Sequence, residues 1–268
     1  MMKYNAVILA GGTSNWLRNI AGTNILCLAK LAGETVLHKL VAALQSSDCI
    51  KEIVITAPHH ALEKITETAH PLNIKVCPSG SSVATTALAG IRALGASSEE
   101  RILFVCGDIP LISGEAVADF IKQCEAYPQD EIFYPIIGKD ICLEEFPEAE
   151  RTFVTLAHGK YTGGNLMFIS AAAVVAGQNK AEEIYCRRKH PWKLCKWLGW
   201  GFIFKAWLGR LTAEEISQRC SELIGLRCRV ITSTYPSVGM DIDKPCDWKL
   251  MCSYYRKSNV LDRGGNQL

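Results

Sequence analysis

The sequence predicts an α/β fold built on a mostly parallel sheet. Short apolar segments alternate with segments of helical periodicity along most of the chain, which is the pattern of consecutive βαβ units. Two apolar segments, residues 6–10 and 102–106, end in glycine or acidic residues, at the strand ends where such sheets bind ligands. The chain has 268 residues, 49% hydrophobic and 21% charged, which suits one globular domain with a sizeable core.

The first predicted strand runs into a glycine loop. Gly11 and Gly12 let main-chain amides approach an anion without a Cβ in the way, and Thr13 and Ser14 follow them. A dinucleotide fingerprint needs a further glycine at position 13, and a Walker A loop needs Gly-Lys-Ser or Gly-Lys-Thr, so both are excluded. The loop therefore indicates a phosphate-sized anion site, with a simple tight turn as the alternative.

The next elements follow in alternation. Helical periodicity is predicted over residues 36–44 and 61–69, and strands over residues 52–56 and 73–77. A further helix runs to Leu94, with Ser81 or Ser82 as N-cap and Gly95 to end it. The N-terminus of this helix can bind an anion or a base edge.

Asp108 follows the strand predicted over residues 101–106. Its position places a carboxylate at the carboxyl edge of the sheet, beside the glycine loop. A carboxylate there can hold Mg²⁺ that bridges phosphates. The alternative is an aspartate that starts a turn or caps the next helix, because Pro110 follows closely.

From residue 130 to 169 the pattern predicts strands without good helices. The strands are expected over residues 132–136, 151–156 and 166–169. Between the last two, the segment Thr162-Gly163-Gly164-Asn165 can lay backbone and amide groups along a polar ligand. The same residue types suit a hairpin turn, which stays open as the alternative.

Residues 180–224 are expected to form a helical insertion that is basic and aromatic. Its cations are Arg187, Arg188, Lys189, Lys193, Lys196, Lys205 and Arg210, together with His190, and its tryptophans are Trp192, Trp197, Trp200 and Trp207. A basic helix with tryptophans can lie on an anionic membrane surface, here through residues 187–210, or bind a phosphorylated partner. The interpretation that we favour is a helical subdomain whose tryptophans pack inward.

The last predicted strand, residues 226–233, leads to Asp241-Ile242-Asp243. An Asp-x-Asp sequence places both carboxylates on one side of an extended backbone, which suits the second half of a metal site. Asp243 suits equally the N-cap of a helix that has Pro245 in its first turn, so Asp241 is the better ligand. The polar tail, residues 258–268, is expected to be disordered.

Charge and cysteine usage bound the setting. The net charge of +2 does not call for nucleic acid as a partner. Twelve scattered cysteines without any Cys-x-x-Cys argue against zinc and for reduced thiols, so a cytoplasmic protein is expected. The N-terminus runs directly into the first strand, which leaves no room for a signal peptide, and no apolar run reaches membrane-span length.

Three separated segments resemble one family. Leu9-Ala10-Gly11-Gly12, the segment 107–111 and the segment 241–247 are similar to the MobA-like nucleoside-triphosphate transferases, relatives of molybdenum-cofactor guanylyltransferase and of the methylerythritol-phosphate cytidylyltransferases. The resemblance extends to about Cys252. It implies a single Rossmann-like, three-layer αβα domain of the nucleotide-diphospho-sugar transferase type over residues 1–257, with the insertion at 180–224 and the tail at 258–268.

The resemblance also implies an activity and a set of site residues. A nucleoside monophosphate would pass from a nucleoside triphosphate to a phosphorylated small-molecule acceptor, with Mg²⁺ as cofactor and pyrophosphate as the second product. The nucleotide would be bound by Leu9, Ala10, Gly11, Gly12, Thr13, Ser14, Gly80, Ser81 and Ser82, and the acceptor by Thr162, Gly163, Gly164 and Asn165. The metal ligands would be Asp108 and Asp241, and the catalytic residues Arg18, Lys30 and Asp108.

Two departures from the family pattern bear on activity. Trp16 stands where the loop usually carries Arg, although Arg18 lies two residues on, and Leu26 stands where Lys is usual, with Lys30 the nearby amine. Loss of a cation that stabilises developing phosphate charge typically lowers the rate by about a hundredfold to a thousandfold. The alternatives are therefore a degenerate nucleotide-binding regulatory protein, or a glycosyltransferase that uses Asp241 and Asp243 as its metal motif.

Overall fold

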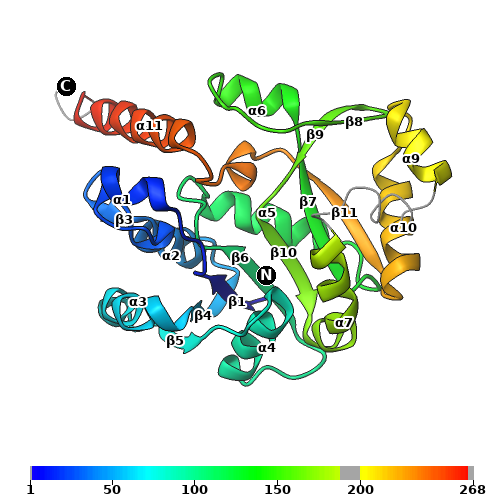
Figure 1. The fold of residues 1–268 in the computed structure, drawn as a ribbon, viewed down its shortest axis with the longest axis horizontal. Coiled ribbons are helices and arrows are strands. Elements are labelled where there is room, and N and C mark those ends of the chain that lie inside the picture. Colours follow the sequence, from blue (N-terminus) through cyan, green and yellow to red (C-terminus); the bar gives the residue numbers. More distant parts are fainter. Residues whose placement is uncertain (1, 188–199, 265–268) are drawn as a thin grey trace.

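A computed structural model describes residues 2–187 and 200–264. Its main sheet has nine strands in the order β5-β4-β1-β6-β10-β7-β9-β8, with β11 on the other side of β7 (Figure 1). The strands are β1 (Tyr4–Leu9), β4 (Ile50–Ala57), β5 (Lys75–Pro78), β6 (Arg101–Cys106), β7 (Ile132–Gly138), β8 (Val154–Leu156), β9 (Gly159–Gly163), β10 (Leu166–Ser170) and β11 (Cys228–Ser233). A separate small hairpin pairs β2 (Lys30–Leu31) with β3 (Glu34–Thr35).

The helices connect these strands and cover the sheet. They are α1 (Asn15–Ala21), α2 (Val36–Ser46), α3 (Leu62–Ala69), α4 (Val83–Leu94), α5 (Gly114–Glu125), α6 (Lys139–Glu145), α7 (Ala171–Arg187), α9 (Trp200–Trp207), α10 (Ala213–Ile224) and α11 (Pro245–Gly264). Short 3-10 turns are η1 (Leu26–Leu28), η2 (His59–Ala61), η3 (His70–Leu72) and η4 (Pro236–Gly239).

The sheet topology brings two distant loops together. Strand β1 lies between β4 and β6 and is parallel to both, with Leu9 beside Thr56 and Cys106. Parallel strands end at the same edge, so the residues that follow β1 and β6 meet there. Antiparallel pairs join β10 to β6 and β7, and β9 to β7 and β8, whereas β11 is parallel to β7. The predicted α/β architecture with a mixed, mostly parallel sheet is confirmed.

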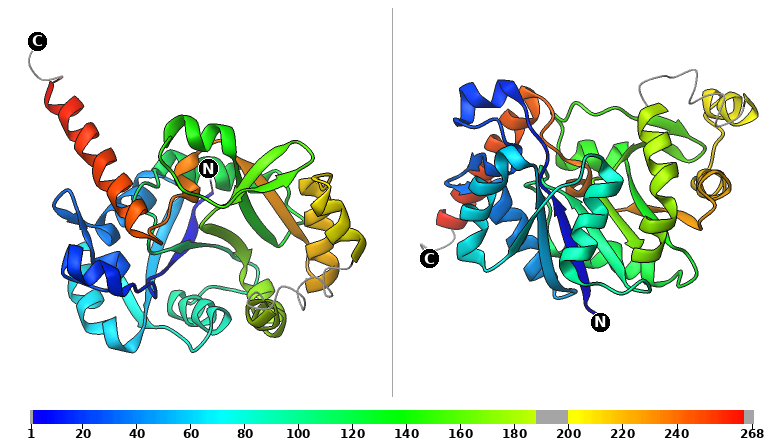
Figure 2. Two further views of the ribbon diagram at one scale, coloured as in Figure 1. Left: turned by 45° about the horizontal axis from the view of Figure 1, so that its top comes forward. Right: turned by 60° about the horizontal axis from the view of Figure 1, so that its bottom comes forward.

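Two apolar layers hold the helices to the two faces of the sheet. On one face, Val7 and Phe104 of the sheet pack with Ile91 of α4 and Val174 of α7. The larger cluster on the other face includes buried residues of α2, α3 and α5, such as Leu40. Figure 2 shows the sheet between these layers. Apolar residues recur at helical spacing in α2, so the face of the helix that packs on the sheet is continuously apolar. Thr35 caps this helix by accepting a hydrogen bond from the His38 amide.

The caps predicted for the helix after β5 are confirmed. Ser82 is the N-cap of α4 and accepts a hydrogen bond from the Thr85 amide, in a capping box that Thr85 completes. Gly95 ends the helix in the left-handed region, at φ 64°. This part of the chain follows local capping chemistry, which explains why it was predictable.

The expectation of strands without helices over residues 130–169 is wrong, because the segment contains α6. The alternative of a hairpin turn at residues 162–165 is excluded too, because β9 and β10 both lie antiparallel to β7 and do not pair with each other. Three steps along β7, from Ile136 to Phe133, face five steps on the other strand, from Gly163 to Phe168. The two extra residues are a bulge at Gly164 and Asn165 rather than a hairpin turn.

The basic and aromatic insertion is helical where the structure describes it. Trp207 of α9 is 79% exposed, so the expectation that the tryptophans pack inward is wrong for this residue. Trp192 and Trp197, with the cations from position 188 to 196, lie outside the described residues. Contact of residues 187–210 with an anionic membrane surface stays a prediction.

The C-terminal segment differs from the expected disordered tail. Helix α11 continues through Gly264 and projects from the body of the molecule, so the expectation is wrong for residues 258–264 (Figure 1). The polar composition of the tail did not indicate that α11 runs without a break from Pro245 to Gly264. Over the described residues, no helix combines the length and apolarity needed to cross a membrane.

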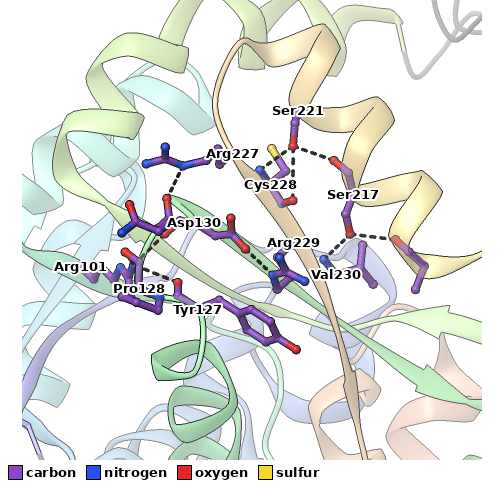
Figure 3. A network of polar contacts seen from close by, with 12 residues as sticks. Arg101, Tyr127, Pro128, Asp130, Ser217, Ser221, Arg227, Cys228, Arg229 and Val230 are labelled. Atoms are coloured by element: carbon purple, nitrogen blue, oxygen red, sulfur yellow. Dashed lines mark hydrogen bonds and ion pairs between the residues drawn. The ribbon is translucent and has the colours of Figure 1, made fainter.

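A polar network fastens the opposite edge of the sheet, where β6 and β11 begin (Figure 3). Arg101 donates to the main-chain oxygens of Pro128, at 2.6 Å, and Asp130, at 2.8 Å. Arg229 pairs with the Asp130 carboxylate and its guanidinium lies 3.7 Å from the centre of the Tyr127 ring. This end of the sheet therefore serves structure, and the open loops lie at the other end.

Candidate functional site

The glycine loop is held tightly against the strand ends. The Gly107 amide donates to the Leu9 oxygen at 3.1 Å, and the Ala10 amide to the Thr56 oxygen at 2.9 Å. A Cβ added to Gly12 would lie 2.9 Å from Leu26 Cδ1 and 3.5 Å from Asp108 Oδ2. A side chain larger than hydrogen would therefore enter the space between the loop and the carboxylate. A Cβ added to Gly11 would meet no atom within 4 Å, so the loop is open on this side.

Asp108 faces this loop, as predicted from its place after β6. Its Oδ1 is buried and has no hydrogen-bond partner among the described residues. The helix that follows is capped by Ser113, which accepts from the Ala116 amide, so Asp108 is not a helix cap. Burial, and next the nearby Asp241 carboxylate, raise the pKa of Asp108 from 3.8 to about 7.

Asp241 reaches the same place from the other half of the sheet. The main chain next to Asp241 is anchored, because the Ile242 amide donates to the main-chain oxygen of Asp108 at 3.1 Å. The amides of Asp243 and Lys244 donate to the Asp247 carboxylate, and α11 begins at Pro245, so Asp243 is not the N-cap of this helix. Burial, and then the charge of Asp241, raise the pKa of Asp243.

Arg151 is the residue of this site that sequence reasoning missed. Its guanidinium pairs with Asp241 Oδ1, and the two side chains are only 12% and 14% exposed. It is also the cation that lowers the pKa of Asp108. The sequence placed Arg151 at the start of a strand, whereas β8 begins at Val154 and leaves Arg151 in an irregular segment. No local signal distinguishes it, because its partner lies in a distant segment of the chain.

The donor set fits a nucleotide-bound divalent cation. The carboxylates of Asp108, Asp241 and Asp243 are close enough to repel one another, and the Arg151 guanidinium acts on this group as a cation. Three carboxylates beside one guanidinium make the site negatively charged. The unpartnered Asp108 Oδ1 is a free acceptor in this field. No group of three or more His, Cys, Asp or Glu side chains suited to a metal occurs in residues 2–187 and 200–264. Mg²⁺ needs only one or two carboxylates when phosphate oxygens and water complete its shell.

The two expected catalytic cations are both exposed. Arg18 lies on α1 and Lys30 on β2, and neither side chain has a hydrogen bond or ion pair with another described residue. The structure therefore leaves both free to meet a ligand but does not join them to Asp108. Their catalytic role stays a prediction.

The residues at the two departure positions have structural contacts of their own. The Trp16 indole donates to the main-chain oxygen of Asp243 at 3.3 Å, and this bond joins α1 to the segment Asp241-Ile242-Asp243. Leu26 is 5% exposed, and its amide donates to the Gly12 oxygen at 3.0 Å. Positions 16 and 26 thus border the site, and both carry side chains without charge.

The segment before α4 lies at the same edge, two strands from β1. Ser82 uses its side chain as the helix cap, and a Cβ on Gly80 would lie 2.3 Å from Thr85 Oγ1. Ser81 is exposed. Thr13 is exposed too, and the Ser14 amide donates to the Asn24 oxygen at 2.7 Å. Nucleotide binding by these residues stays a prediction.

The bulge at Gly164 and Asn165 holds η4, the turn that precedes Asp241, against the sheet. The main chain of Asn165 makes two hydrogen bonds here: its N–H donates to the Val238 oxygen at 2.9 Å, and its carbonyl oxygen accepts from the Cys106 N–H at 3.0 Å. A Cβ on Gly163 would lie 2.3 Å from the Tyr134 hydroxyl. Gly163 therefore brings Tyr134 close to the site, while an acceptor-binding role of residues 162–165 stays a prediction.

Comparisons with known proteins agree with this geometry. A model described as the MobA-like NTP transferase domain matches residues 6–191. A hypothetical transferase from Thermus thermophilus is 27% identical, with a TM-score of 0.78 over 92% of this chain and 99% of that one. No curated protein sequence matches the chain.

Two further solved structures share the fold at lower identity. A CMP-2-keto-3-deoxy-manno-octonic acid synthetase in complex with CTP is 11% identical, with a TM-score of 0.61 over 95% of this chain and 99% of that one. The 4-diphosphocytidyl-2C-methyl-D-erythritol synthase from Anaerococcus prevotii is 13% identical, with a TM-score of 0.57 over the same shares.

Proposed function

Because this chain belongs to the MobA-like NTP transferase domain family, we propose that it is a Mg²⁺-dependent nucleotidyltransferase. A phosphate of a small-molecule acceptor would attack the α-phosphorus of a nucleoside triphosphate. The new bond joins the acceptor oxygen to that phosphorus, and the bond to the leaving pyrophosphate breaks. The observation that carries the proposal is the meeting of Asp108 and Asp241 beside the glycine loop, with Asp108 Oδ1 unpartnered.

The residues of the chain contribute positioning and charge. The amides around Gly11 and Gly12 would hold the triphosphate, because neither glycine has a Cβ that would keep the phosphates from the main chain. Asp108 and Asp241 would hold Mg²⁺, which when bound offsets the charge of the carboxylates and of the phosphates. Arg18 and Lys30, both exposed, would add positive charge to the phosphates. Little covalent work falls to the protein in such transfers.

A pyrophosphate-release assay tests the proposal. The wild-type protein is incubated with each of the four ribonucleoside triphosphates, Mg²⁺ and a panel of sugar and polyol phosphates. We expect pyrophosphate that depends on both the acceptor and the metal, and a strong loss of it in Asp108→Asn. The matched control is Asp48→Asn, since Asp48 is exposed, far from the site in the sheet topology, and at φ 57°, which Asn tolerates.

The products separate this reading from the two alternatives. When a nucleoside-diphosphate sugar replaces the triphosphate, transfer of the sugar to an acceptor with release of the nucleoside diphosphate would indicate a glycosyltransferase. Nucleotide binding by calorimetry without any product would indicate a regulatory nucleotide-binding protein. Of these two alternatives, the uncharged side chains of Trp16 and Leu26 and their structural contacts favour the regulatory nucleotide-binding protein over the glycosyltransferase.

A further inference from the structure

The ion pair between Arg151 and Asp241 occupies a carboxylate that the proposed metal site needs. Asp241 Oδ1 is the atom that pairs with the guanidinium, and it accepts no hydrogen bond besides. Both side chains are largely withdrawn from water, so solvent screens the attraction between the two charges less than at an exposed pair. A carboxylate so engaged is less available to a second cation.

The two partners differ in how firmly the chain holds them. Asp241 is followed by an amide that donates to Asp108, and the next residues are tied to Asp247 at the start of α11. Arg151 instead lies between α6 and β8, outside any helix or strand. When another cation binds Asp241, the guanidinium is therefore the partner that moves.

Arg151 also lies near Tyr134 and Gly163, where the acceptor is predicted to bind. It influences the pKa of Tyr134, whose hydroxyl lies next to Gly163, while burial is the larger cause that raises this pKa. The glycine loop, by contrast, borders Asp108. A guanidinium released from Asp241 here meets ligands on the β7 side, and it binds phosphate or carboxylate through two parallel hydrogen bonds.

We infer that Arg151 exchanges partners during binding: it pairs with Asp241 in the free protein, and releases it to bind an anionic group of the acceptor when a divalent cation occupies the site. This inference rests on the proposed function for the identity of the acceptor. It makes acceptor binding depend on prior metal binding, and it assigns Arg151 an acceptor-binding role.

A titration with Mn²⁺ alone tests the exchange, with free Mn²⁺ followed by electron paramagnetic resonance. Loss of the competing guanidinium, and of its repulsion, should tighten Mn²⁺ binding by about threefold to tenfold in Arg151→Gln. Arg151→Lys keeps the charge and should stay close to the wild type. Weaker or unchanged binding in Arg151→Gln overturns the inference, because Arg151 would then only orient Asp241.

The matched control is Arg229→Gln. It removes the Arg229 pair with Asp130, an ion pair of the same residue types at the opposite edge of the sheet (Figure 3). We expect a loss of thermal stability similar to that of Arg151→Gln with no change in Mn²⁺ affinity. A tightening in this variant as well would assign the effect to net charge and overturn the exchange.

Methyl phosphate serves as probe for the released guanidinium. By calorimetry, the wild type should bind it more tightly with Mn²⁺ than without, and Arg151→Gln should lose most of that gain. Equal binding with and without metal in the wild type overturns the exchange. Neither titration requires turnover, so a protein that releases no pyrophosphate fails the proposed function while these shifts still decide the role of Arg151.

Discussion

Asp108→Asn gives a test in which stability and binding change in opposite directions. The native protein holds the Asp108 proton more tightly than the unfolded chain, because its pKa rises from 3.8 to about 7. The stabilisation that this proton gives is complete below pH 3.8 and is lost as the pH rises to 7. At pH 8 the wild type therefore carries a buried charge that Asn lacks.

The size of the effect follows from the pKa. A rise from 3.8 to about 7 corresponds to at most about 4 kcal/mol, at 1.36 kcal/mol for each tenfold change in proton affinity. Because the side chain keeps some contact with solvent, we expect about 2 kcal/mol, or about 4 to 8 °C in Tm. Asp108→Asn should thus unfold at higher temperature than the wild type at pH 8, and at a similar temperature at pH 4.

The assay is differential scanning calorimetry of both proteins without metal at pH 4 and pH 8, with Asp48→Asn as control. Addition of Mn²⁺ and a nucleoside triphosphate at pH 8 should then raise the Tm of the wild type and change that of Asp108→Asn little. A variant that is less stable than the wild type at pH 8 would mean that Asp108 makes stabilising contacts in the native protein, and the reasoning on its unpartnered oxygen would be refuted.

Substitutions at three other parts of the site, the glycine loop, Trp16 and Leu26, give further tests. Gly12→Ala should cost about 1 kcal/mol, because its Cβ would lie 2.9 Å from Leu26 Cδ1, whereas Gly11→Ala should be neutral in chemical denaturation; both should weaken nucleotide binding in calorimetry. Trp16→Phe removes the hydrogen bond to Asp243 and should raise the Kd for nucleotide while costing at most about 1 kcal/mol of stability; an unchanged Kd would contradict the link. Leu26→Lys should raise pyrophosphate release, because it adds a positive charge near Gly12 and Asp108, where the family usually has Lys. Leu26→Met is the uncharged control and should leave pyrophosphate release unchanged.

The sequence by itself determined the elements whose causes are local. The apolar run of β1 stops at Gly11 and Gly12, and the caps Ser82 and Gly95 bound α4, because strand, loop and cap preferences act over a few residues. The position of Asp108 was also predictable, since a residue just after a parallel strand must lie at the carboxyl edge of the sheet.

Only the tertiary structure decided which distant residues meet at that edge. The pair of Arg151 with Asp241, and the contact of Trp16 with Asp243, join segments far apart in the chain. Whether these residues meet depends on the order of the strands in the sheet and on the paths of the loops. The residue pattern of a single segment does not determine either of them. The bulge between β9 and β10 has the same origin: Gly164 and Asn165 suit a turn locally, and pairing of both flanking strands with β7 makes them a bulge instead.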